Sequence, residues 1–384
     1  MHLAIDASNI RQGGGMTHLS QLLSLASPAD SGFTQVTVWA CRSTLAQLPS
    51  RPWLIKYSAS WTDAGLLQRL LGQQLLLKSE MSRLGCDVLF SPGGSVPFHT
   101  GLPVVTMSQN MLPFEPREAF RFGRWSWMRL KMWLLRQSQG RSLKAADGLI
   151  FLTEYAQENI TRWLGTSQGI KILIPHGIDS RFATPPKTQH EMDKFSMDQA
   201  FTFLYVSILM PYKHQIQVAQ AANCLRQQGY PIKIRFIGED WGGYGQELRK
   251  TLQQLDPQEE FLFWPGSVPF ANLHAEYQSA DAFLFASSCE NLPNILIEAM
   301  ASGLPIACST RGPMPEVLGD AGIYFDPVVV QEMVEAMRTL VENPDLRRCL
   351  AEKAYERSKA YSWKKCADET FGFIATVAKL KSQR

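Results

Sequence analysis

The sequence predicts an α/β protein built from two doubly wound, Rossmann-like domains. Its 384 residues are too many for one ordinary hydrophobic core, and 45% of them are apolar, which is enough to bury two sheets. Short apolar runs alternate with amphipathic helical stretches along the chain, a pattern typical of parallel strands covered by helices on both faces. A polar, proline-containing stretch near the middle of the chain separates the two domains.

The apolar runs define the predicted strands, because each is short and bounded by turn-forming or amphipathic segments. One sheet is predicted from residues 3–7, 35–40, 88–90, 104–107, 148–152 and 171–174. A second sheet is predicted from residues 201–207, 232–237, 261–264, 282–285, 305–308 and 322–325.

The predicted domains are an N-terminal domain, residues 1–183, a linker, residues 184–198, and a C-terminal domain, residues 199–361. The linker is polar, contains two adjacent prolines and shows no hydrophobic period. Ligands of open α/β sheets bind beyond the carboxyl ends of the strands. Two such sheets facing each other would form a central cleft, with an acceptor on one side and a donor on the other.

Composition and charge narrow the classes of function. A formal net charge of +3 does not favour a nucleic-acid partner. The seven cysteines form no CxxC pair and no metal-ligand spacing, so we expect thiols in a reducing cytoplasm and no metal site. Residues 1–6 are expected to form a strand and not a signal peptide, and no run of about 18 apolar residues predicts a membrane-spanning helix.

Two carboxylates, Glu290 and Glu298, lie on either side of a predicted strand-to-helix junction. The apolar run 282–286 precedes them, Pro293 is expected to open the helix and Gly303 to end it. Glu290 therefore falls in the loop and Glu298 about one turn inside the helix, with the N–H groups of the helix start between them. Carboxylates that accept hydrogen bonds from hydroxyls, on both sides of an anion site, suit a sugar–diphosphate–ribose ligand. The alternative interpretation is that Glu290 and Glu298 are solvated surface acids.

The region 263–327 resembles the donor-binding half of the retaining GT-B glycosyltransferases of family 4, glycosyl transferases group 1. The matching motifs are WPGSV at 264–268, SADAFLF at 279–285, ENLPNILIE at 290–298, EAMASGLP at 298–305 and MPEVL at 314–318, preceded by PHGID at 175–179 and PYKH at 211–214. The likeness covers nearly the whole chain and is weaker in the first half. It implies GT-B architecture, with the C-terminal helix, residues 362–384, packing back on the N-terminal domain.

The resemblance assigns roles to three side chains. In the family, Glu290 contacts hydroxyls of the donor sugar and Glu298 accepts hydrogen bonds from the ribose hydroxyls. Lys213 meets the donor diphosphate, where a fixed ammonium stabilises the negative charge that develops on the departing nucleotide. Relatives often carry an arginine five residues before this lysine. Here that position is Ile208, so either one cation suffices or another basic residue substitutes.

Backbone groups complete the donor site that the resemblance implies. Those of Asn291, Leu292 and Asn294 are expected to hold the sugar and the diphosphate. Those of Gly266 and Val268 are expected to read the edge of the nucleotide base. Because backbone readout leaves almost no trace in a sequence, uridine and guanosine donors are not distinguished.

The N-terminal domain is expected to contribute Gly14, within the glycine run 13–15, as a further donor-binding residue, and Gln109, Asn110 and His176 on the acceptor side. Glycine lets the backbone approach a phosphate or sugar closely, although the spacing is not a dinucleotide fingerprint. Many relatives have a histidine-containing pair where this chain has Gln109 and Asn110, and neither amide acts as a base near neutral pH. That fits a retaining mechanism, in which the leaving phosphate takes the acceptor proton, better than an inverting one.

Residues 117–144 are the strongest charge feature, with eight basic residues against one acid, Glu118. Trp125, Trp127 and Trp133 are interleaved. This composition on an amphipathic helix is typical of a segment that binds an anionic membrane surface. The alternative is a solvated basic face above a stripe that faces the core.

Together with the resemblance, these patterns predict a cytoplasmic, retaining, metal-independent hexosyltransferase that needs no cofactor and lies peripherally at the inner face of the cytoplasmic membrane. It would move a hexose from a nucleoside diphosphate sugar to a glycan or polyprenyl-linked acceptor in the assembly of a surface polysaccharide, such as O-antigen or exopolysaccharide. One alternative is a sugar-nucleotide epimerase or hydrolase, which would need a general acid or base in the cleft. The other is a non-catalytic nucleotide-sugar-binding subunit, for which Ile208 is the only indication.

Overall fold

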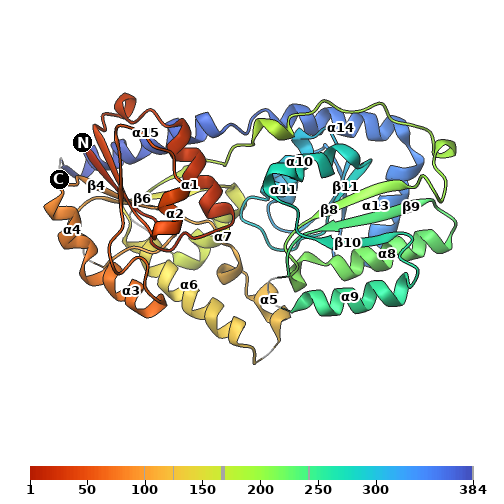
Figure 1. Ribbon diagram of the computed structural model, residues 1–384, viewed down its shortest axis with the longest axis horizontal. Coiled ribbons are helices and arrows are strands. Elements are labelled where there is room, and N and C mark those ends of the chain that lie inside the picture. Colours follow the sequence, from red (N-terminus) through yellow and green to blue (C-terminus); the bar gives the residue numbers. More distant parts are fainter. Residues whose placement is uncertain (99, 124, 166–168, 241–242, 383–384) are drawn as a thin grey trace. The chain divides into compact units, whose positions relative to one another are not determined.

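The computed structural model describes residues 1–98, 100–123, 125–165, 169–240 and 243–382. The chain divides into two compact units (Figure 1). Unit 1 comprises Met1–Pro116, Trp125–Gly177 and Ser362–Arg384, and unit 2 comprises Arg117–Arg124 and Ile178–Tyr361. Each unit is built on a parallel sheet, so the predicted α/β class with two doubly wound sheets is confirmed.

The described strands of unit 1 form a sheet in the order β3-β2-β1-β4-β5-β6-β7. Chain order reverses between β1 and β4, and β1 is buried along its length. Such a reversal opens a crevice beyond the carboxyl ends of the two strands, where ligands bind. The strands are β1 (His2–Asp6), β2 (Gln35–Trp39), β3 (Leu54–Tyr57), β4 (Val88–Ser91), β5 (Val104–Met107), β6 (Gly148–Phe151) and β7 (Ile170–Leu173).

Strand β3 was not predicted from the sequence. It lies at the sheet edge, its Leu54, Ile55 and Tyr57 are only partly buried, and Lys56 is exposed. An edge strand of this kind lacks the continuous apolar run by which buried parallel strands are found.

The helices of unit 1 cover both faces of its sheet. The C-terminal helix α15 packs against α1 and against β4, β5 and β6, and the rings of Phe33 and Phe371 lie 6.0 Å apart. The helices are α1 (Gly14–Leu25), α2 (Arg42–Gln47), α3 (Leu66–Leu75), α4 (Leu77–Arg83), α6 (Trp127–Ala145), α7 (Glu154–Leu164) and α15 (Trp363–Ser382), with 3-10 turns η1 (Pro28–Ser31) and η2 (Leu112–Phe114).

The described strands of unit 2 form a second parallel sheet in the order β10-β9-β8-β11-β12-β13. Here chain order reverses between β8 and β11, which places the ligand crevice beyond the ends of these two strands. The strands are β8 (Phe201–Val206), β9 (Ile232–Ile237), β10 (Leu262–Gly266), β11 (Ala282–Phe285), β12 (Ile306–Ser309) and β13 (Ile323–Phe325).

Helix α8 of unit 2 packs against α9 and α13, while α11 packs against α12 and α14. The helices are α8 (Gln215–Gln227), α9 (Tyr244–Leu255), α10 (Phe270–Ser279), α11 (Asn294–Ala301), α12 (Met314–Leu318), α13 (Val330–Glu342) and α14 (Pro344–Ser358), with 3-10 turns η4 (Ser180–Phe182), η5 (Met192–Lys194) and η6 (Pro211–Lys213).

The stretch expected as a linker, residues 184–198, is hydrogen-bonded to the rest of unit 2. The buried guanidinium of Arg347 donates to Gln189 Oε1 at 2.9 Å and to the carbonyl of His190, and it also binds two carbonyls at the end of α13. Nearer the start of the stretch, Thr184 N donates to Ala301 O at 2.9 Å.

The basic segment 117–144 is not one helix. Residues 117–124 belong to unit 2, through a short helix α5 (Pro116–Ala119) and a 3-10 turn η3 (Phe120–Phe122), whereas α6 in unit 1 begins only at Trp127. Gly123 has a left-handed φ of 97°, and the Ser126 hydroxyl caps α6 by accepting from Arg129 N. The expectation that the whole segment lies in the N-terminal domain is therefore wrong for residues 117–124.

None of the helices among the described residues is long and apolar enough to cross a membrane. The same part of the chain contains no group of three or more His, Cys, Asp and Glu side chains placed to hold a metal ion.

Candidate functional site

The loops that leave β8 and β11 meet at the switch point of unit 2, and each carries one predicted site residue. Lys213 ends η6 after β8, and Glu290 lies in the loop after β11. The Lys213 ammonium donates a hydrogen bond to Glu290 Oε1. The side chains are 5% and 16% exposed, so the two predicted residues form a largely buried ion pair that the sequence did not indicate.

The surroundings of Lys213 fix its position. Its Nζ lies 5.3 Å from the ring centre of Tyr212 and 5.6 Å from that of Phe285, so aromatic faces attract the charge. The Tyr205 hydroxyl donates to the backbone carbonyl of Lys213. A buried ammonium needs a negative partner, so an anion that reaches this crevice competes with or joins Glu290 at Lys213.

A second polar network joins the same two loops to residues 117–124. The Ser288 hydroxyl donates to Glu118 Oε2 at 2.5 Å, and His214 Nε2 lies 3.0 Å from Ser288 Oγ. Burial, aided by the positive charge of Arg121, lowers the pKa of His214 to about 4, so the ring is neutral at pH 7. Arg121 itself forms a 2.6 Å ion pair with Glu118. This arginine therefore brings another positive charge to the loops that hold Lys213 and Glu290.

Glu298 lies on α11, where the Tyr277 hydroxyl donates to its Oε2 at 2.9 Å. Burial raises the pKa of this carboxyl to about 7, an effect that the Tyr277 hydrogen bond and the Arg181 charge partly oppose. Arg181 is held by Asp179 at 2.9 Å. Glu298 therefore changes its protonation near neutral pH.

The start of α11 presents backbone and amide groups around the predicted diphosphate position. Asn291 and Leu292 are buried, and Asn294 N donates to Leu292 O at 3.0 Å. The N–H groups of the third and fourth residues of α11 donate to Pro293 O. Asn294 Oδ1 is buried and accepts no hydrogen bond from the described residues.

The stretch predicted to read the base ends strand β10. Gly266 has a left-handed φ of 94°, and its carbonyl accepts from Gly238 N at 2.9 Å; Val268 follows, partly buried. Trp264 Nε1 donates to Gly238 O at 3.0 Å. A Cβ on Gly238 would lie 1.7 Å from Ser207 O, so only glycine permits this approach of the loops after β8 and β9.

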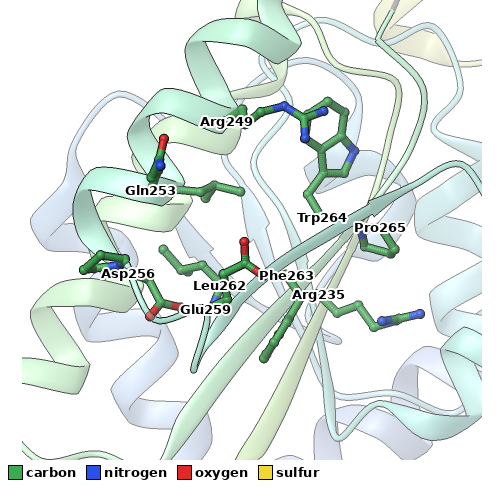
Figure 2. Close-up of a pocket in the computed structure, with 11 residues that line it drawn as sticks. Arg235, Arg249, Gln253, Asp256, Glu259, Leu262, Phe263, Trp264 and Pro265 are labelled. Carbon is green, nitrogen blue, oxygen red and sulfur yellow. Dashed lines mark hydrogen bonds between the residues drawn. The ribbon is translucent and has the colours of Figure 1, made fainter.

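A cavity of about 420 Å³ lies beside this stretch, between β10 and α9 (Figure 2). The Arg249 guanidinium stacks 4.8 Å above the Trp264 ring at its wall. The residues that line it do not include Lys213, Glu290 or Glu298, so this cavity is separate from the ion pair.

In unit 1, two of the predicted acceptor-side residues, Gln109 and His176, contact His18, which sequence reasoning did not select. Gly14 begins α1, the helix that carries His18. Gln109 Nε2 lies 3.2 Å from His18 Nδ1, and the His18 ring stacks on His176 at 4.7 Å. Trp363 covers the other side of His176 at 5.2 Å. Burial and the neighbouring His176 lower the pKa of His18 well below its usual range, so its ring is neutral.

Asn110 has a different role in the structure. Its Oδ1 accepts a hydrogen bond from Leu112 N at 3.1 Å, which begins the turn η2, and the residue is exposed. The side chain is therefore occupied by the local turn, as is typical of asparagine after a strand.

Residues 187–357 match the family model described as glycosyl transferases group 1. Likeness to the glycosyl transferases group 1 family thus covers this segment, which is less than half of the chain. The segment contains Lys213, Glu290 and Glu298, together with the strands of unit 2 that position them.

Curated glycosyltransferases are similar to this chain over part of their length. O-antigen chain mannosyltransferase B of Escherichia coli is 22% identical over 62% of each protein. The GDP-mannose-dependent alpha-(1-6)-phosphatidylinositol monomannoside mannosyltransferase of Mycolicibacterium smegmatis is 26% identical over 52% of this chain and 54% of that protein. This chain thus spans less than two thirds of the length of these relatives.

Solved structures match the chain over its whole length. Sucrose-phosphate synthase from Thermosynechococcus elongatus has a TM-score of 0.75 at 17% identity, covering 100% of this chain and 98% of that one. HepE from Anabaena, in complex with UDP and glucose, has a TM-score of 0.69 at 16% identity, covering 100% of both. These likenesses show the fold, the two Rossmann-like domains of GT-B glycosyltransferases.

Proposed function

We propose that this chain is a retaining glycosyltransferase that moves a hexose from a nucleoside diphosphate sugar to a glycan or lipid-linked acceptor. The observation that carries the proposal is the buried Lys213–Glu290 pair at the switch point of unit 2. It supplies a cation for the diphosphate and an acceptor for sugar hydroxyls. The names of the relatives support surface-polysaccharide and glycolipid acceptors, and HepE was solved with UDP and glucose.

The proposed reaction breaks the bond between the anomeric carbon and the diphosphate oxygen. A hydroxyl oxygen of the acceptor forms a bond to that carbon on the same face, and its proton passes to the departing phosphate oxygen. Lys213 stabilises the charge that develops on the diphosphate, and Glu290 holds the sugar. Glu298 accepts hydrogen bonds from the ribose, so the nucleotide is oriented at both ends.

We further propose that the reaction needs neither a cofactor nor a metal ion. Arg121 would add its charge to that of Lys213 and so fill the role of the arginine that Ile208 replaces. Its ion pair with Glu118, and through Glu118 its link to Ser288, support this assignment.

The test is transfer from UDP- and GDP-hexoses to lipid-linked oligosaccharide acceptors, followed by NMR of the product. The proposal expects the anomeric configuration of the donor to be kept, and Lys213→Ala to depress turnover more than donor affinity. An inverted product contradicts retention. Release of free sugar or an epimerised donor would establish the hydrolase or epimerase alternative, and binding without turnover would establish the binding subunit.

We also propose that α6 docks on the anionic cytoplasmic face of a membrane. Lys131, Arg141 and Lys144 are exposed on it, as are Trp127 and Trp133. Each basic side chain near an anionic surface adds about 1 kcal/mol, within a Debye length. Lys131→Gln/Arg141→Gln/Lys144→Gln should abolish most vesicle binding at low salt, measured by co-sedimentation. Equal binding of the wild type to neutral and anionic vesicles would contradict it.

Two basic residues of the segment are unsuited to that test. Arg136 lies 5.7 Å from the ring centre of Trp163 and is partly buried, so its removal would also disturb packing. Arg124 lies outside the described residues.

A further inference from the structure

Helix α3 turns its polar side chains toward the body of unit 1. Arg69 Nε donates to Asn9 Oδ1 at 3.0 Å, and the buried amide of Gln73 donates to Asp6 and to Ser95 O. Gly72 lies so close to Trp61 that a Cβ would be 2.4 Å from it. The inner face of α3 is therefore made of polar and small residues, the reverse of an ordinary surface helix.

The outer face of α3 is a row of leucines. Leu66, Leu67, Leu71 and Leu75 are between 59% and 76% exposed. Side chains at these spacings lie on one side of a helix, so they form a continuous apolar surface. Contiguous apolar patches on a protein surface mark contacts with another protein or a membrane.

The leucine face is connected to α6 by the chain at 95–98. Gln74 Oε1 at the end of α3 accepts from Phe98 N at 2.9 Å, and Val96 N donates to Ser142 Oγ of α6 at 3.0 Å. The Phe98 ring between them is 63% exposed. Helices α3 and α6 therefore lie in one region of unit 1 (Figure 1), connected through residues 95–98.

The positive charge of this region favours an anionic partner over a second copy of the chain. Residues 64–79 contain no acid, and neither does α6 (Trp127–Ala145), which carries five basic residues. Two copies meeting through this face would bring two basic helices together, which like-charge repulsion opposes. An anionic bilayer can bind both the basic helix α6 and the leucine face of α3. Its headgroups attract the basic side chains, and the boundary of its acyl chains accepts the leucines.

We propose that the leucine face of α3 inserts into the interface of an anionic lipid bilayer whose headgroups α6 contacts. The proposal extends the docking proposed for α6 and is independent of glycosyl transfer. The α3 leucines supply the part of membrane affinity that salt does not screen, and α6 supplies the part that salt removes.

The test compares three forms of the full chain on vesicles of equal parts phosphatidylglycerol and phosphatidylcholine, at low and high salt and without donor. The leucine variant is Leu67→Gln/Leu71→Gln/Leu75→Gln, and the matched control is Lys131→Gln/Arg141→Gln/Lys144→Gln. The leucine variant should lose at least about tenfold in the binding that persists at high salt. The control should keep that binding and lose the salt-sensitive part.

The exposed leucines make few internal contacts, so the leucine variant should melt at the wild-type temperature. If it does not, Leu66→Gln/Leu67→Gln at the start of α3 replaces it. Unchanged high-salt binding of the leucine variant overturns the proposal and leaves the docking of α6 standing. No vesicle binding by the wild type overturns both. A wild-type dimer that the leucine variant dissociates without loss of vesicle binding assigns the face to a second copy instead.

Discussion

The buried contact between Lys213 and Glu290 makes each residue depend on the other. Removing one leaves the other without its charge partner, which is costly where water is excluded. We predict that Lys213→Met and Glu290→Gln each lower the free energy of unfolding, and that the double variant loses about 2 kcal/mol less than the sum. Urea unfolding of the four proteins measures this coupling. Additive losses would mean that the pair is absent in solution.

The two glutamates should affect different stages of the reaction. Glu298→Gln should weaken binding of a nucleoside diphosphate by roughly 1.5–3 kcal/mol, because a charged acceptor of the ribose is lost. Glu290→Gln should leave that binding intact or tighter, since it frees Lys213, yet should cut turnover. Calorimetry with UDP and GDP, alongside turnover, separates the two. The reverse pattern would exchange their assignments.

The protonation of Glu298 should make stability depend on pH. Burial raises its pKa from the ordinary 4.5 to about 7, so the folded protein holds this proton more tightly than the unfolded chain does. Its contribution to stability is complete below pH 4.5 and is lost as the pH rises through about 7.

The glutamine side chain of Glu298→Gln cannot ionise. The free energy of unfolding of this variant should therefore rise relative to that of the wild type, by about 3 kcal/mol between about pH 4 and about pH 8. Unfolding free energies across this range test it. A difference between the two proteins that does not change with pH would show that Glu298 is not buried as described.

Sequence motifs identified Lys213, Glu290 and Glu298 one by one, but not their partners. Glu118 bonds Ser288 across 170 positions, and Gln109 meets His18 across 91 positions. Neither pair leaves a local pattern, because the fold alone brings such residues together. Asn110 shows the opposite case, since its amide is used by its own turn.

At the scale of the elements, we expect the close backbone approach at Gly238 to affect stability more than the helix propensity of a glycine inside a helix does. A Cβ there would collide with Ser207 O, so Gly238→Ala should cost about 3 kcal/mol and disturb the base-reading stretch. Gly372→Ala in α15 is the matched control. It meets nothing within 4 Å and should gain about 0.5–1 kcal/mol. If both changes shifted the thermal midpoint equally, a clash at Gly238 and open space at Gly372 would be contradicted.

Elements with continuous apolar runs could be predicted, and those without them could not. The strands predicted from the sequence agree with the structure to within two residues at each end. Strand β3 was missed because it lies half-exposed at an edge. The break in 117–144 was missed because the positive φ of Gly123 and the cap at Ser126 interrupt a pattern whose basic and tryptophan content continues across them.

At the scale of the whole molecule, the described strands of each sheet reverse their order once, and the ion pair of unit 2 lies at such a reversal. In unit 2, the loops after β8 and β11 supply Lys213 and Glu290. The alternation of strands and helices was sufficient to predict doubly wound sheets. The assignment of residues 117–124 to unit 2 was not predictable, because it depends on contacts with Tyr212 and Ser288 far along the chain.

The measurement that tests the central claim most directly is a calorimetric titration of the wild type and of Lys213→Ala with UDP, GDP and their hexose sugars. The account predicts that the wild type binds one nucleoside diphosphate series, with the diphosphate required for affinity. Lys213→Ala should bind it at least about tenfold more weakly, as expected for loss of a charge-assisted contact. Binding of neither series, or equal binding by the variant, would contradict a nucleotide-sugar site at the Lys213–Glu290 pair.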